Sequence, residues 1–282
     1  MSVSRLPGRL VLLGHPVSHS LSPAFQNAAL RHAGVPLEYE PLDVPPVELA
    51  SRFAALAAQR TAGNVTTPHK ALVAALCDRL TSLAGRVGAV NTFWHEEGGV
   101  VGDNTDVGGV DEAVAALLGR SPAGLRVALI GAGGAASAVL AAAERWPDCR
   151  VTVWSRRPER CEALVARFAD VATAADLLAD AIRSADLVVN ATPTGLTDDG
   201  IPVPPALLRR RAAVLDLVYR RDGPTPWVRL ARALGRPAID GLPMLIAQGA
   251  LAFERWLGQP PDRDVMWAAV GRGRTTAAGG VD

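Results

Sequence analysis

Short apolar runs alternate with Ala- and Leu-rich segments along the first hundred residues. The runs typical of strands are 9–14, 37–42, 62–66, 89–95 and 99–102. The segments typical of helices are 22–33, 46–58 and 70–77. Ser22 followed by Pro23 predicts the start of the first helix, with Ser22 as N-cap and Pro23 at the first helical position. Strands that alternate with helices predict βαβ units and therefore an α/β fold.

A second pattern of this kind begins near residue 125. Its predicted strands are 126–130, 150–154, 186–191 and 213–219, and residues 237–240 close this half. Its predicted helices are 135–145, 159–168, 226–234 and the long apolar segment 244–257. This order is typical of a doubly wound sheet. The Gly-rich stretch from 271 to 282 is expected to be a disordered tail.

Length and charge exclude several classes of protein. A chain of 282 residues is long enough for about two domains. Its 29 basic and 28 acidic residues give a net charge of +1, which predicts binding neither to nucleic acid nor to a membrane surface. No apolar run reaches the roughly 18 residues of a membrane span. The 3 cysteines lie far apart without a CxxC pair, so we expect reduced thiols in a cytoplasmic protein.

The basic residues are almost all arginines, and Lys70 is the one lysine of the chain. A preference for arginine explains the excess but not why one position stays lysine. An arginine keeps its proton at any working pH, whereas a lysine ammonium can give its proton up in suitable surroundings. Lys70 is therefore a candidate acid/base group.

A glycine-rich turn joins the strand 126–130 to the following helix. Its pattern is G-x-G-x-x-A, with Gly131, Gly133 and Ala136 at the small positions. Such a turn lets the backbone approach a pyrophosphate, and the helix N-terminus attracts the phosphate charge. The residues assigned to this contact are Gly131, Ala132, Gly133, Gly134 and Ala135.

The end of the next strand indicates which dinucleotide binds. An NAD site usually has an acidic residue there to accept from the ribose, but here Ser155, Arg156 and Arg160 follow the strand. An arginine cluster suits a 2′-phosphate, so we predict NADP as the cofactor. Thr192, in the polar turn 190–195 after a later strand, and Gly241 complete the predicted cofactor site.

Four polar clusters follow strand-like runs in the first half. They are Ser18–Ser20, Asn64–Lys70, Asn91–Thr92 and Asp103–Asp106. Hydroxyls, amides, one lysine and one carboxylate suit a small polyhydroxylated substrate that needs many neutral hydrogen bonds and one titrating pair.

With these motifs the chain resembles the shikimate dehydrogenase family. The resemblance runs from about residue 14 to 260. It is carried by GHPVSHSLSP at 14–23, NVTTPHK at 64–70, GAVNT at 88–92, GDNTD at 102–106, GAGGAA at 131–136, SRRPER at 155–160, NATPTGL at 190–196, DLVY at 216–219 and MLIAQGALAFERW at 244–256.

The resemblance implies an α/β fold of two domains with a cleft between them. An N-terminal α/β domain at 1–105 would bind the substrate, and a Rossmann-type doubly wound domain at 106–240 would bind NADP. Helices at 241–270 would return to the substrate domain, and 271–282 would be the tail. The implied reaction is the reversible, NADPH-dependent reduction of 3-dehydroshikimate to shikimate.

The resemblance also implies roles for individual residues. Ser18 and Ser20 would hold the substrate carboxylate. Tyr219 would line the pocket near the nicotinamide. The ring hydroxyls would be bound by Asn64, Thr66, Asn91 and Gln248. Lys70 and Asp106 would be the catalytic pair, since an ammonium can stabilise the oxygen of a ketone that accepts hydride and then deliver a proton.

Other interpretations stay open or are disfavoured. A family relative that acts on quinate or an amino-substituted analogue, and a non-catalytic NADP(H)-binding regulatory protein, are alternatives. His15 and His19 are spaced as metal ligands on a helix, but Pro16 between them predicts a loop, and we expect no metal. Ser18–Ser20 lacks the GxSxG turn of a hydrolase, and His69 is expected to be structural. The sequence allows a monomer or a homodimer.

Overall fold

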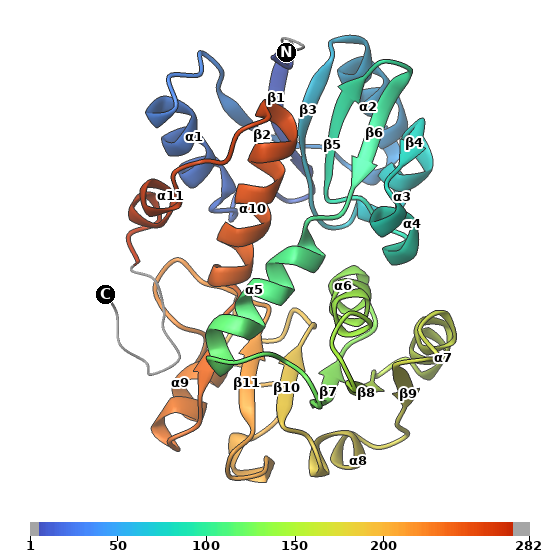
Figure 1. Cartoon of the computed structure of the whole chain (residues 1–282), viewed down its shortest axis with the longest axis vertical. Coiled ribbons are helices and arrows are strands. Elements are labelled where there is room, and N and C mark those ends of the chain that lie inside the picture. The colour runs from blue at the N-terminus through green and yellow to red at the C-terminus, as the bar shows by residue number, and fades with distance from the viewer. Residues whose placement is uncertain (1–5, 273–282) are drawn as a thin grey trace. The chain divides into compact units, whose positions relative to one another are not determined.

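The computed structural model describes residues 6–272, which form two compact units (Figure 1). Residues 6–106 and 245–272 make up the first unit, and 107–244 make up the second. Each unit is built around a six-stranded sheet. Apart from residues 271 and 272, the predicted disordered tail lies outside the described residues.

The sheet of the first unit is mixed, with the strand order β2-β1-β3-β5-β6-β4. Its strands are β1 (Arg9–Gly14), β2 (Tyr39–Asp43), β3 (Thr61–Val65), β4 (Arg79–Leu80), β5 (Thr92–Glu96) and β6 (Gly99–Asp103). β1 runs parallel to β2 and β3, whereas β5 is antiparallel to both of its neighbours, β3 and β6. The helices of this part of the chain are α1 (Ser22–His32), α2 (Leu49–Ala58), α3 (Lys70–Leu76), α4 (Ser82–Val87), α10 (Leu242–Leu257) and α11 (Arg263–Ala269).

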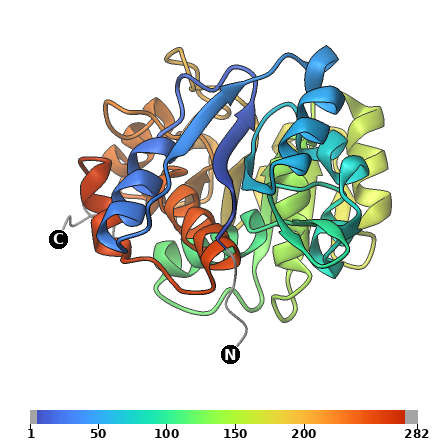
Figure 2. The same ribbon diagram turned by 90° about the horizontal axis from the view of Figure 1, so that it is seen from above.

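Helices cover both faces of this sheet, which explains why β1 is apolar without alternation. On one face Val11 and Leu13 pack with Phe53 of α2, whose ring meets that of Phe93 edge to face at 5.0 Å. On the other face Trp256 of α10 stacks on Tyr39 of β2. Figure 2 shows the C-terminal helices (red) beside α1 (blue).

The sheet of the second unit is parallel throughout, with the order β12-β11-β10-β7-β8-β9. Its strands are β7 (Arg126–Ile130), β8 (Arg150–Trp154), β9 (Ala172–Ala174), β10 (Leu187–Asn190), β11 (Ala213–Asp216) and β12 (Ala238–Ile239). The helices are α5 (Asp106–Leu118), α6 (Gly134–Ala143), α7 (Pro158–Arg167), α8 (Leu178–Arg183) and α9 (Pro226–Ala233). The chain reverses its direction of winding between β7 and β10, which is the strand order of a Rossmann fold and the place where such sheets bind ligands.

The core of the second unit explains why its strands read as continuous apolar runs. Ile130 and Val188 pack with Ile182 of α8 and Trp227 of α9 on one face of the sheet. Leu129, the neighbour of Ile130, is also fully buried, which requires cover on the opposite face.

Several predicted elements differ from the structure in their bounds, among them three in the first unit. The expected helix 46–58 is a 3₁₀ turn at Pro46–Glu48 followed by α2, because the prolines at 45 and 46 cannot donate within a helix. The expected strand 37–42 is β2 at Tyr39–Asp43. Ser22 is the first residue of α1 and not its N-cap, and its backbone N–H donates to Oγ of Ser20 at 3.1 Å.

Candidate functional site

The lone lysine and the predicted acidic partner form an ion pair in the first unit. Lys70 begins α3, directly after the loop that leaves β3, and Asp106 begins α5 after β6. Lys70 Nζ donates to Asp106 Oδ2 at 2.6 Å. The side chain of Lys70 is 23% exposed and that of Asp106 is 6% exposed, so the ammonium remains accessible while the carboxylate is enclosed.

The amide of Asn91 joins this pair to the last long helix. Its Nδ2 lies 2.9 Å from Asp106 Oδ1, 2.9 Å from Thr105 Oγ1 and 3.1 Å from Gln248 Oε1 of α10. Its Oδ1 accepts from the backbone N–H of Thr105 at 2.7 Å, which fixes the amide so that Nδ2 faces the carboxylate. The predicted residues Lys70, Asp106, Asn91 and Gln248 are therefore connected by direct contacts.

Asn64 belongs to the same polar region. Its Nδ2 donates to the backbone carbonyl of Asn91 at 3.1 Å, and its Oδ1 accepts from the hydroxyl of Tyr39 at 2.8 Å. The sequence singled out neither Tyr39 nor Thr105 individually. Thr105 could have been found from its place inside the cluster 103–106, but nothing near Tyr39 in the sequence marks it.

The other substrate residues lie in loops at the carboxyl end of β1 and β3. Ser18 and Ser20 follow β1, and Thr66 follows β3. The two loops are bonded to each other, since the N–H of His15 donates to Thr67 O at 3.0 Å and that of Thr66 donates to Leu13 O at 2.8 Å. Ser18 is exposed, and Ser20 and Thr66 are half-buried.

His69 is structural, as predicted. Its side chain is fully buried, and Nε2 lies 2.7 Å from the carbonyl of Val44. His15 and His19 are exposed, and among the described residues no group of three His, Cys, Asp or Glu side chains could hold a metal ion. No described helix is long and apolar enough to cross a membrane.

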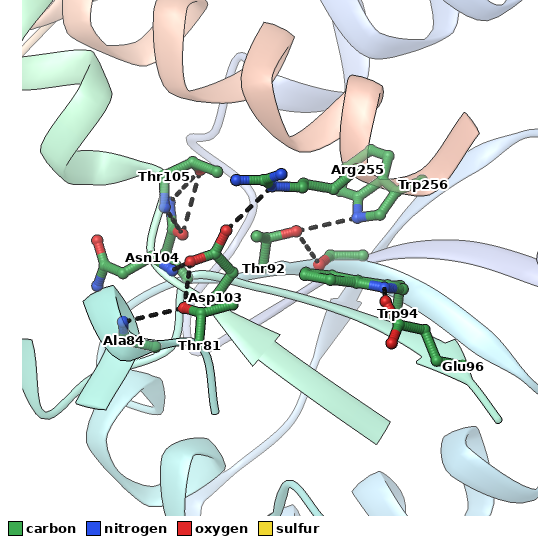
Figure 3. A network of polar contacts seen from close by, with 12 residues as sticks. Thr81, Ala84, Thr92, Trp94, Glu96, Asp103, Asn104, Thr105, Arg255 and Trp256 are labelled. Carbon is green, nitrogen blue, oxygen red and sulfur yellow. Dashed lines mark hydrogen bonds and ion pairs between the residues drawn. The ribbon is translucent and has the colours of Figure 1, made fainter. Parts of the chain in front are cut away.

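A second network ties α10 to the end of β6 (Figure 3). The buried carboxylate of Asp103 accepts from Arg255 Nε at 3.1 Å, from Thr81 Oγ1 at 2.5 Å and from the N–H of Asn104 at 2.8 Å. Trp256, the neighbour of Arg255, donates from Nε1 to Thr92 Oγ1 at 2.9 Å. Because β6 leads into Asp106 and α10 carries Gln248, these bonds support both sides of the Asn91 amide.

The glycine-rich turn of the second unit has the form that a dinucleotide requires. Gly131 has φ +116°, and a Cβ added there would lie 2.9 Å from the carbonyl oxygen of Ala191 in the loop after β10. Gly133 and Gly134 are exposed and face open space, and Gly133 is the N-cap of the ten-residue helix α6. Ala132 and Ala135 are half-buried beside them. The turn therefore leaves a cradle at a helix N-terminus where a phosphate fits.

The end of β8 presents positive charge. Arg156 and Arg160 are exposed, and neither forms an ion pair within the described part of the chain. Ser155 is half-buried, and its Oγ accepts from the N–H of Arg157 at 3.3 Å. These guanidinium groups fit the 2′-phosphate of NADP, which is a group of two negative charges.

A buried acid is connected to the loop after β10 by hydrogen bonds through Asn190. Thr192 donates from its N–H and its Oγ1 to Oδ1 of Asn190, at 3.0 and 2.7 Å. Asn190 Nδ2 donates in turn to Asp216 Oδ1 at 2.8 Å. Burial raises the pKa of Asp216 to about 6, although its hydrogen bonds oppose the shift. Asp216 is not among the residues predicted from the sequence, because an acid at a strand end carries no local sign of burial.

Tyr219 and Gly241 also belong to the second unit. Tyr219 is half-buried and follows β11. Gly241 precedes α10, and a Cβ there would lie 2.2 Å from the carbonyl oxygen of Leu217. The close approach of the two backbones explains why this position is glycine.

Family models match most of the chain in three parts. The shikimate dehydrogenase substrate binding domain matches residues 12–93, and the shikimate 5'-dehydrogenase C-terminal domain matches 241–270. The saccharopine dehydrogenase NADP binding domain matches 127–235 between them.

Whole proteins are similar over nearly their full length. An NADP(+) shikimate dehydrogenase of Rubrobacter xylanophilus is 43% identical over 96% of this chain and 99% of its own. The shikimate 5-dehydrogenase of Thermus thermophilus, solved with NADP(H) and shikimate, is 40% identical with a TM-score of 0.83, over 93% of this chain and 98% of its own. A quinate dehydrogenase of Corynebacterium glutamicum, solved with NAD, is 29% identical with a TM-score of 0.83, over 92% of this chain and 97% of its own.

Proposed function

Because the chain belongs to the shikimate dehydrogenase family, we propose that it catalyses the reversible NADPH-dependent reduction of 3-dehydroshikimate to shikimate. The observation that carries this proposal is the Lys70–Asp106 ion pair, with the amides of Asn91 and Gln248 bonded beside it. This arrangement of side chains supplies one proton donor among neutral hydrogen-bonding groups, as a polyhydroxylated ketone requires.

Lys70 and Asp106 divide the acid/base chemistry. As hydride reaches the carbonyl carbon, negative charge develops on oxygen, and the Lys70 ammonium stabilises that charge and donates a proton. In the oxidation direction the neutral Lys70 amine takes the proton from the hydroxyl. Asp106 orients Nζ through its 2.6 Å bond.

The remaining polar residues bind the substrate. Asn64, Thr66, Asn91 and Gln248 bind the ring hydroxyls, and the hydroxyls of Ser18 and Ser20 hold the carboxylate. The accessible positions of Ser18, Ser20 and Thr66 support this assignment. Tyr219 lines the substrate pocket on the nicotinamide side.

Residues of the second unit hold the cofactor. The backbone of 131–135 binds the pyrophosphate, Arg156 and Arg160 bind the 2′-phosphate beside Ser155, and Thr192 and Gly241 lie toward the nicotinamide. When bound, NADPH supplies the hydride. We therefore assign the first unit, residues 6–106 and 245–272, to the substrate and the second unit, residues 107–244, to the cofactor.

The composition of the chain supports the expected partners and location. The substrate is a small molecule, and the balanced charge supports no nucleic-acid partner. The cysteines at 77, 149 and 161 are unpaired, which supports a cytoplasmic location.

A quinate dehydrogenase is the second candidate, because one of the similar solved structures has that activity and binds NAD. The unpaired Arg156 and Arg160 favour NADP for this chain. The intact Lys70–Asp106 pair argues against a non-catalytic NADP(H)-binding regulatory protein, which needs no titrating pair.

The test is the absorbance of the reduced nicotinamide, followed with purified protein for shikimate or quinate, each with NADP⁺ or NAD⁺. We expect turnover with shikimate and NADP⁺. In the double variant Arg156→Ala/Arg160→Ala, we expect KM for NADP⁺ to rise about 10- to 100-fold, because one or two charge-assisted contacts to the 2′-phosphate are lost. KM for NAD⁺ should not change. A preference for quinate would move the protein to the second candidate. Dinucleotide binding without any turnover would establish the regulatory protein instead.

A further inference from the structure

The proposed chemistry leaves one buried acid without a role. Asp216 ends β11 and is 0% exposed. Its Oδ1 accepts from Asn190 Nδ2 at 2.8 Å and from the N–H of Val218 at 3.2 Å, and its Oδ2 accepts from Thr225 Oγ1 at 2.7 Å. All three partners are neutral donors, so every hydrogen bond at this carboxylate points toward it.

Two of these bonds lead to residues of the proposed cofactor site. Asn190 uses its Oδ1 to hold the N–H and the hydroxyl of Thr192. Val218 uses its carbonyl to hold the N–H of Gly241 at 2.9 Å. Thr192 and Gly241 are therefore each separated from the carboxylate by a single residue, and they reach it from opposite sides of β11.

We propose that Asp216 is a positioning residue for the dinucleotide, and that its carboxylate fixes Thr192 and Gly241 at the nicotinamide side of the cofactor site. This inference rests on the proposed function for the identity of the ligand. A carboxylate can only accept, so Asn190 must present Nδ2 to it and keep Oδ1 for Thr192. An amide or a protonated acid at 216 both donates and accepts, and would allow Asn190 to turn round and lose Thr192.

The carboxylate is retained at a cost in stability. Burial is the main cause that raises the pKa of Asp216, and Asp240 of the neighbouring strand end is the charged group that adds to the shift. The groups facing Asp216 from β10, from α9 and from the following loop are the neutral Asn190, Thr225 and Val218. A group that served only to stabilise the fold would be better as an uncharged amide.

The experiment compares Asp216→Asn with the unaltered protein in equilibrium titrations of NADP⁺ and NADPH, and in thermal unfolding near neutral pH. We expect the variant to unfold at a higher temperature but to bind the dinucleotide about tenfold more weakly, as for one lost hydrogen bond. KM for shikimate should not change. Gain of stability with loss of affinity is the result that a merely structural residue would not produce.

Lower pH provides a second readout. Protonation of Asp216 below about pH 6 should weaken dinucleotide binding by the unaltered protein, and the variant should lack this component. The 2′-phosphate of the ligand also titrates near pH 6, but it does so with both proteins, so the difference between them reports on residue 216.

Asp111→Asn is the matched control. Asp111 of α5 also has a pKa raised by burial, and it accepts from Trp146 Nε1 at 2.8 Å, away from the residues assigned to the cofactor. This variant should bind the dinucleotide as the unaltered protein does.

Each outcome bears on the proposal. Unchanged affinity in Asp216→Asn would overturn it, and so would a joint loss of affinity and stability, which general loosening explains. Dinucleotide binding with the expected effect but no shikimate turnover would support this inference and overturn the proposed function. An unaltered protein that binds no dinucleotide would overturn both.

Discussion

Two buried polar side chains, one in each unit, are bonded to several neighbours, and they differ in charge. In the first unit it is the amide of Asn91, which donates to Asp106 and Gln248 and accepts from Thr105. In the second unit it is the carboxylate of Asp216, which only accepts. An amide joins donors and acceptors without burying a charge, whereas a carboxylate imposes the direction of every bond at a cost in stability. The buried carboxylates of the first unit, Asp103 and Asp106, differ from Asp216 because each is paired with a cation, and the ammonium of Lys70 that pairs with Asp106 stays partly exposed.

The largest effect is expected where that exposed charge is removed. Lys70→Ala should lower kcat by about 10²- to 10⁴-fold, the usual contribution of a general acid, and leave dinucleotide affinity unchanged. Steady-state rates and a dinucleotide titration measure the two quantities, with Arg52→Ala, whose exposed side chain pairs with Glu48, as the control. Near-normal turnover would contradict the assignment. Because Lys70 is the one lysine, a lysine-selective reagent should inactivate the enzyme, and bound shikimate should protect it.

The comparison can be broken by replacing the amide of Asn91 with a carboxylate. Asn91→Asp would place a second acid beside Asp106, at a site where the present Nδ2–Oδ1 distance is 2.9 Å. Like charges and a lost donor should reduce the free energy of unfolding by about 2 to 4 kcal/mol. Urea unfolding measures this change, and Asn91→Ala, which loses the donor without adding charge, should cost about 1 to 3 kcal/mol. Equal losses in the two variants would show that the charge of residue 91 is unimportant.

The opposite exchange, Asp216→Asn, should stabilise the second unit. The pKa of about 6 in the folded protein is above the ordinary value of 3.8, so the folded state binds the proton more tightly than the unfolded state. The stabilising contribution of this group is present below about pH 4 and is lost as pH rises through 6. The variant should therefore gain about 2 to 3 kcal/mol above pH 6, and the gain should disappear near pH 4. Unfolding at several pH values tests this, and a gain that is constant with pH would contradict it.

The smallest effect is expected from the support that holds α10. Arg255→Gln should reduce the free energy of unfolding by about 1 kcal/mol or less, because its side chain is 56% exposed and solvent screens the pair with Asp103. KM for shikimate should rise a few-fold, since the helix that carries Gln248 is less firmly held, while KM for NADP⁺ stays the same. Arg79→Gln, which breaks the exposed pair with Glu96, should change neither constant.

The sequence determined the alternation of strands and helices and the positions where polar groups follow strands. Apolar runs such as 9–14 and 126–130 predict buried parallel strands, and these are β1 and β7. The turn at Gly131 is equally local, because a φ of +116° is a conformation that glycine adopts readily and other residues rarely adopt. The lone Lys70 and the acid at 106 were found in the same way, from composition and from the ends of strands.

Only the tertiary structure decided how distant groups are joined. Asn91 and Gln248 are 157 positions apart, and no local pattern indicates that their side chains are bonded. The helix α5 was not predicted, because its valines and glycines favour a helix only weakly and packing decides its form. Asp216 ends a strand as many exposed acids do, and it became a buried group with a raised pKa because β10, β12 and the start of α9 enclose it. Periodicity and turns are properties of neighbouring residues, whereas burial and hydrogen-bond partners depend on which segments the fold brings together.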